Sequence, residues 1–250
     1  MNEQPPKPPS EDPGSLRSPI RPTRPEDFPI KTPLPGSIPL PGTSEEPILA
    51  PLPQNPSEAL EALRQKMETV ASDFSQGKIN RAQFNAVYGR YSEQRNIIEK
   101  LMQRDPDNQA WKAVAAPGHT RFLIDHFEAH ALYYLVFLHN RPKPLIWGGK
   151  QPPDGPTVIS ILKTLWGMSN RPKAGAARKE VSGGRWLLIV VGESALTIVL
   201  FSLEPASLQI SRVRDMHSDF ERANRLLLER GMTSPERLVF PQRALVEETL

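Results

Sequence analysis

The segment Arg185–Val213 constrains the fold more than any other part of the chain, because it is the richest in residues that favour β-strands. Its three short apolar runs are dominated by β-branched and aromatic side chains, which suit a pleated, half-buried surface. Two turn signals, at 192–194 and 204–207, separate the runs. Short turns favour antiparallel pairing, since parallel neighbours need a longer crossover. The segment therefore predicts a three-stranded meander over Trp186–Val191, Leu196–Leu203 and Leu208–Val213.

Proline marks the beginning of the chain, where residues 1–56 hold 17 of the 28 prolines. This segment has few aromatic residues and cannot bury enough apolar surface to offset the entropy lost on ordering. We expect a disordered tail with local polyproline II character. A spacing such as Pro22–Pro25 could dock in an aromatic groove, but the composition favours a plain spacer.

A helical hairpin is predicted over residues 57–104. Asn55-Pro56-Ser57-Glu58 has the residues of a capped helix start, and Gly77 provides the turn. Apolar residues recur at spacings of three and four on both sides of that turn, as in a coiled coil. The glycine turn followed by Phe84 resembles the short helical hairpins of the SHOCT type. Two helices make a thin core, so the hairpin stripe could pair with a partner chain through Leu63, Met67, Val87 and Tyr91.

The region 118–231 predicts helices alternating with groups of strands, in the order α-β-β-α-β-β-β-α. A linker over 105–117 precedes it and a C-terminal tail over 232–250 follows it. Helices placed between antiparallel strand groups must cover the sheet, which makes the fold class α+β. The expected elements are a helix at 120–129, strands at 131–139 and 145–147, a helix at 157–168, the meander, and a helix that begins at Ser218 with Glu221 as its capping partner and ends at Gly231.

This order and size resemble the roadblock/LC7 family of profilin-like folds. The likeness rests on the strand pair of Leu132–Trp147, the crossing helix Thr157–Met168, and the meander with its capped last helix. Pro142, Pro144 and the long basic loop before the meander depart from the pattern, and a GAF-like or longin-like domain has a similar order. The resemblance implies a non-enzymatic homodimer that serves as a platform or regulator for a small Ras-like GTPase or for a motor complex.

Three residues are candidate partner contacts in this second region. In the roadblock manner, two copies would pair through a sheet edge or through the crossing helix, which carries Ile161 and Leu165. Trp186 opens the meander beside the basic loop, and large aromatic side chains are enriched at protein contacts.

The charge of the chain is mild overall but uneven. The formal net charge is +3, yet residues 141–185 contain nine Lys or Arg and two acidic residues. A basic patch attracts nucleic acid, anionic lipid or an acidic partner surface. The alternative function is therefore binding of nucleic acid or another anionic polymer, although no recognised nucleic-acid motif is present. The candidate anion-binding residues are Arg171, Lys173, Arg178, Lys179 and Arg185.

No catalytic set, metal site or cofactor site is predicted. The chain has no cysteine, which excludes thiol catalysis and thiolate zinc sites. His126 and His130 lie four residues apart but lack further ligands, and an enzyme built around these histidines is the weakest of the three functional hypotheses. Gly148-Gly149-Lys150 lacks the second half of a phosphate loop, and Gly192-Glu193-Ser194 lacks the second glycine of a nucleophile elbow.

The predicted location is the cytoplasm. The N-terminus lacks the apolar core of a signal peptide, and no apolar run approaches the ~20 residues needed to span a bilayer. The absence of cysteine fits a reducing compartment. The leading hypothesis is accordingly a cytoplasmic, dimeric, non-enzymatic adaptor.

Overall fold

The fold is described from a computed structural model, which describes residues 53–116, 118–139, 141–170 and 172–246. All of them lie in the second of the chain's two units, which begins at Ala50. The tail predicted over 1–56 lies outside the described residues as far as residue 52, and so does Arg171.

The first part of the described chain is helical. Helix α1 (Pro56–Ser75) begins at Asn55, whose side chain accepts a hydrogen bond from Glu58 N at 2.8 Å. Helix α2 (Arg81–Arg104) begins at Asn80, which forms a reciprocal capping box with Gln83. Satisfying the free N–H groups of a first turn in this way stabilises a helix start by about 1 kcal/mol. The two helices share one apolar core.

Two short helices, α3 (Trp111–Ala115) and α4 (Thr120–His126), follow where the sequence predicted a linker and the first helix of the second region. Trp111 is buried in the core that α1 and α2 share, and Leu123 and Ile124 of α4 pack against it. Two helices alone leave apolar stripes uncovered, and α3 and α4 supply part of the cover.

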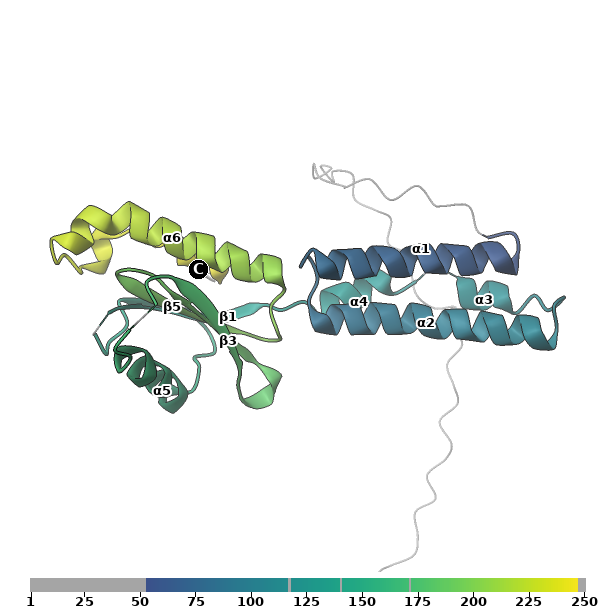
Figure 1. Cartoon of the computed structure of the whole chain (residues 1–250), viewed down its shortest axis with the longest axis horizontal. Helices are drawn as coiled ribbons and strands as arrows, with labels where there is room; N and C mark the ends of the chain where they lie inside the picture. Colours follow the sequence, from purple (N-terminus) through teal and green to yellow (C-terminus); the bar gives the residue numbers. More distant parts are fainter. Residues whose placement is uncertain (1–52, 117, 140, 171, 247–250) are drawn as a thin grey trace, which may run out of the picture. The chain divides into compact units, whose positions relative to one another are not determined.

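The second part is a five-stranded antiparallel sheet in the order β2-β1-β5-β4-β3 (Figure 1). This confirms the predicted α+β class with an antiparallel sheet. Strands β2 and β3 form the two edges. The central strand β5 is buried at every residue, because helices cover both faces of the sheet. The strands are β1 (Ala131–Leu138), β2 (Ile146–Gly149), β3 (Gly175–Glu180), β4 (Trp186–Val191) and β5 (Ala195–Phe201).

The sheet separates two apolar cores, as Figure 1 shows by the helices on its opposite sides. Helix α5 (Gly155–Trp166) packs on one face through Val158 and Leu162, against the β4 residues Leu187 and Ile189. Helix α6 (Ser207–Glu229) packs on the other face through Val213 and Phe220.

The prediction of a third meander strand over Leu208–Val213 is wrong, because these residues form the first turns of α6. The inward residues of α6 follow the helical spacing of three and four, and the Gln209 side chain accepts a hydrogen bond from Ala206 N at 2.9 Å. Ser218 is therefore an exposed residue inside the helix and not its cap. The inward residues are Ile210, Val213, His217, Phe220, Asn224 and Leu227.

The strand that completes the sheet is β3, which lies in the segment predicted as a basic loop. An edge strand pairs on one side only and is often charged, so its sequence need not carry an apolar run. The predicted C-terminal tail also differs, because residues 238–246 pack on α6 and on the α6 side of the sheet. Its buried residues are Leu238, Phe240, Gln242 and Val246.

Candidate partner-binding groove

Strand β3 presents an unpaired edge within the described part of the chain, because its ladder runs only to β4, from Gly175 opposite Val191 to Glu180 opposite Trp186. Residues directly opposite in an antiparallel pair point to the same face. The β4 residues Leu187, Ile189 and Val191 belong to the core under α5. Their partners on β3, namely Lys179, Ala177 and Gly175, therefore also face the α5 side.

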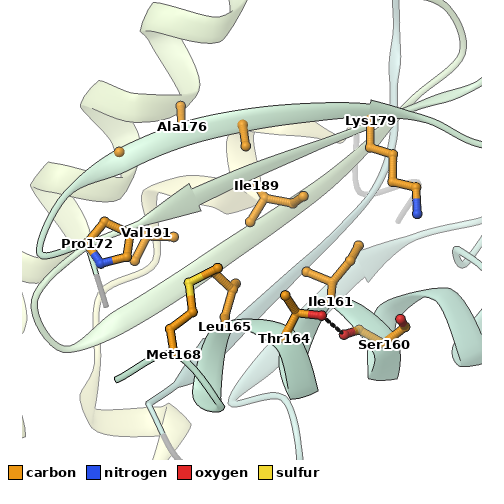
Figure 2. A pocket seen from close by; sticks show the side chains of 12 residues that line it. Ser160, Ile161, Thr164, Leu165, Met168, Pro172, Ala176, Lys179, Ile189 and Val191 are labelled. Carbon is orange, nitrogen blue, oxygen red and sulfur yellow. Dashed lines mark hydrogen bonds between the residues drawn. The ribbon is translucent and has the colours of Figure 1, made fainter. Parts of the chain in front are cut away.

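A groove of about 550 Å³ lies between α5 and this edge. Gly175 and Ala177 have too little side chain to fill the space beside the helix, which leaves the groove open. Figure 2 shows the apolar side chains along it and Lys179, which extends from β3 toward α5. The apolar walls come from Ile161, Leu165, Met168, Pro172, Ile189 and Val191.

Two polar residues of α5 also line the groove. The Thr164 hydroxyl donates to Ser160 O at 2.9 Å, so it is already engaged within the helix. The Ser160 side chain is exposed. With few polar groups and one ammonium group, the groove suits apolar side chains of a partner better than a highly polar ligand.

The predicted partner contacts fall in three different places. Ile161 and Leu165 are half-buried and line the groove. Trp186 packs against the core on the α6 side, with the Arg178 guanidinium 5.8 Å from its ring centre. The four residues of the hairpin stripe are buried inside the core that α1 and α2 share: Leu63, Met67, Val87 and Tyr91.

The described basic residues do not come together in one patch. Arg178 and Lys179 are neighbours on β3 and therefore face opposite sides of the sheet. Arg178 forms an ion pair with Glu204 at 3.1 Å, whereas Lys179 lines the groove. Arg185 donates from Nε to Ser182 O at 3.2 Å, and Lys173 lines a separate cavity.

That separate cavity, of about 160 Å³, lies beside a buried polar cluster that the sequence reasoning missed. His217 on α6 is 2% exposed, and its Nδ1 lies 2.8 Å from Thr197 Oγ1. Burial lowers the pKa of His217; the nearby Glu221 carboxylate raises it, and His139 lowers it further. The signal that could have identified this position is its place on the inward stripe of α6, where a histidine must be buried.

Among the described residues, no group of three His, Asp or Glu side chains is placed to hold a metal ion. His126 stacks on Phe122 with 5.5 Å between the ring centres and meets Phe127 edge-on. None of the described helices combines the length and the hydropathy that a membrane-spanning helix needs.

No protein-family model, curated protein or solved structure matches the chain. The groove and the sheet edge beside it are the structural features that bear most directly on function.

Proposed function

We propose that the chain is a non-enzymatic protein-interaction module whose binding face is the groove between α5 and β3 together with the free edge of β3. The observation that carries this proposal is the position of an apolar groove alongside an unpaired strand. Adding a strand to a sheet edge satisfies its main-chain hydrogen-bonding groups, and the adjacent groove takes up apolar side chains.

The occupant we propose is a second copy of the chain. Two β3 strands can pair antiparallel about a twofold axis, which makes the same surface on both copies self-complementary. Centred on Ala177, the register sets Gly175 opposite Lys179 and Ala176 opposite Arg178 of the other copy. This register avoids like charges directly opposite each other, whereas one centred on Arg178 would set two guanidinium groups face to face.

A small Ras-like GTPase is the further partner that the roadblock resemblance implies. The element order α4-β1-β2-α5-β3-β4-β5-α6 has the same succession of helices and strands as the expected one, although its additional strand is β3 before β4 and not Leu208–Val213 after β5. In this proposal the paired copies form the platform, and the GTPase binds the pair rather than a single chain. Adding a Ras-like GTPase to the dimer and to a monomeric variant tests this step, with binding expected only for the dimer.

Light scattering over a wide range of protein concentration tests the pairing. Ile161→Arg adds a second cation to the groove wall that Lys179 already lines and should make the protein monomeric, because a buried unpaired charge is costly. Ile159→Arg is the matched control, since Ile159 lies on the same helix, is 52% exposed and is not among the groove-lining residues. A native protein that stays monomeric throughout would overturn the proposal.

A single engineered cysteine tests the register, because the chain contains none of its own. Ala177→Cys would lie opposite its own copy across the twofold axis, within the Cα separation of about 4.4–6.8 Å that a disulfide requires. It should form a cross-linked dimer on mild oxidation. Ala176→Cys on the same strand should not, because the register sets it opposite Arg178 of the other copy and leaves the two cysteines offset along the strands. Equal cross-linking of both variants would contradict the register.

A further inference from the structure

The turn between β4 and β5 is held by a carboxylate from α6. Glu221 Oε1 accepts hydrogen bonds from Ser194 N at 2.7 Å and Ala195 N at 2.9 Å, and Oε2 accepts from Glu193 N at 3.2 Å. Three successive backbone amides thus converge on one side chain that is 20% exposed. Such charge-assisted bonds are stronger than neutral ones, so Glu221 fixes the turn against the helix.

His217 lies one helical turn before Glu221 and has an unused nitrogen. Its Nε2 has no hydrogen-bond partner among the described residues and is shielded from solvent. The same atom lies 3.9 Å from Glu221 Oε1. A buried polar atom without a partner is costly and uncommon in native proteins. We assign the proton of the neutral ring to Nδ1, donating to Thr197 Oγ1, so that Nε2 needs one added proton and one small movement to bond Glu221 directly.

We propose that His217 and Glu221 form an acid-responsive latch on the β4–β5 turn. When the imidazole takes up a proton, Nε2–H donates to Glu221 Oε1, and the carboxylate loosens its hold on the amides of Glu193, Ser194 and Ala195. Closing the 3.9 Å separation to an ordinary hydrogen bond requires a movement of about 1 Å. This movement lengthens the bonds that now fix the turn.

The close packing around Gly192 limits how the His217 ring and the Glu221 carboxylate can move toward each other. A Cβ added to Gly192 would overlap His217 Nε2 and the Glu221 carboxylate, so both side chains are closely packed on this residue. The ring is also held from its other nitrogen by Thr197. The Glu221 carboxylate, which is partly exposed, is freer to shift than the His217 ring. Its shift takes the hydrogen-bond acceptor away from the turn amides.

The environment of His217 sets the pH range over which the His217–Glu221 latch responds. His139 directly follows β1, and its Nε2 lies 2.8 Å from Gly192 O. Glu221 favours protonation of His217 and His139 opposes it, while Arg214 of α6, Lys173 before β3 and Glu193 line the adjacent cavity. Gln242 approaches Thr197 from the C-terminal segment and carries no charge. Because burial lowers the pKa of His217, release occurs on the acid side of its ordinary value of 6.5.

Amide hydrogen exchange of the full-length protein, followed by NMR between pH 8 and pH 5, tests the latch. After correction for the intrinsic pH dependence of exchange, protection of the 193–195 amides should fall by about tenfold as the His217 ring takes up its proton. The ring nitrogen signals of His217 report that protonation in the same sample. Unchanged protection through the titration of His217 would overturn the proposal.

Two variants separate a latch from general acid sensitivity. His217→Gln cannot take up a proton, and its turn protection should be independent of pH. His130→Gln removes an exposed histidine outside the cluster and should keep the native response. If His217→Gln loses turn protection on acidification as the native protein does, the latch is wrong. Should His217→Gln fold poorly, the simultaneous titration of ring and turn in the native chain still decides.

Discussion

Asn224 of α6 binds the backbone of Val239 in both directions. Its Oδ1 accepts from Val239 N at 2.9 Å, and its Nδ2 donates to Val239 O at 2.7 Å and to Phe220 O at 2.8 Å. One buried amide therefore attaches the C-terminal segment to the helix and places Phe240 against Phe220, with 5.3 Å between their ring centres. This explains why residues that the sequence suggested were a tail belong to the core.

Replacing Asn224 with Ala should lower the free energy of unfolding by about 1–3 kcal/mol, because the buried amide is lost and two part-buried backbone groups of Val239 lose their partner. Urea denaturation measures the loss. Asn96→Ala is the control, since Asn96 is exposed on α2 and should change stability by less than about 0.5 kcal/mol. Equal values for the two variants would show that the attachment of Val239 contributes nothing.

Trp111 should account for much of the stability of the helical part. It is 3% exposed in the core of α1 and α2, and removing such a side chain costs about 3–5 kcal/mol. We expect Trp111→Ala to reduce the unfolding free energy by this amount in thermal or urea denaturation. Phe122→Ala is matched to it, because Phe122 lies on the neighbouring short helix but is 60% exposed, and it should have little effect. A small effect of Trp111→Ala would indicate that α3 does not stabilise the helix pair.

Protonation of His217 should make the free energy of unfolding depend on pH. Its pKa is lowered in the folded state, so below 6.5 the unfolded chain binds more protons than the folded one. Stability is therefore fully present above 6.5 and is lost as the pH falls toward the folded-state pKa. Carboxylates that titrate at lower pH are shared by the native protein and His217→Gln, so the difference between their unfolding curves isolates the histidine. Parallel curves from pH 8 to pH 5 would exclude this contribution.

The order of helices and strands was predictable, but one strand was identified in the wrong place. The apolar runs of β4 and β5 and the capping residues of α1 and α2 are strong local signals. The apolar run Leu208–Val213 alone predicts a strand, because a short apolar run does not distinguish a strand from a buried helix. Extending the pattern to Phe220 and Leu227 would have revealed a single helical stripe.

Strand β3 could not have been found from its own residues. Its sequence, Gly-Ala-Ala-Arg-Lys-Glu, has low β propensity, and it is a strand because β4 offers a free edge. The groove also depends on the pairing of β3 with β4, since Gly175 and Ala177 leave space beside α5 only when they face that helix. Ile161 and Leu165 were identifiable from the helical stripe, whereas the role of Glu221 depends on turn amides that lie 26 to 28 residues earlier in the chain.

Replacing Gly192 or Gly89 with alanine should change the free energy of unfolding in opposite directions. A Cβ at Gly192 would fall within 2.5 Å of three side-chain atoms of His217 and Glu221, so Gly192→Ala must displace the groups that fix the turn and should destabilise the protein by about 1–3 kcal/mol. Gly89 lies inside α2 with no atom within 4 Å of an added Cβ. Gly89→Ala should therefore stabilise by about 1 kcal/mol, because alanine favours the helix. Urea denaturation of both variants measures the two shifts, and a neutral Gly192→Ala would mean that the close packing of the turn on α6 is not maintained in solution.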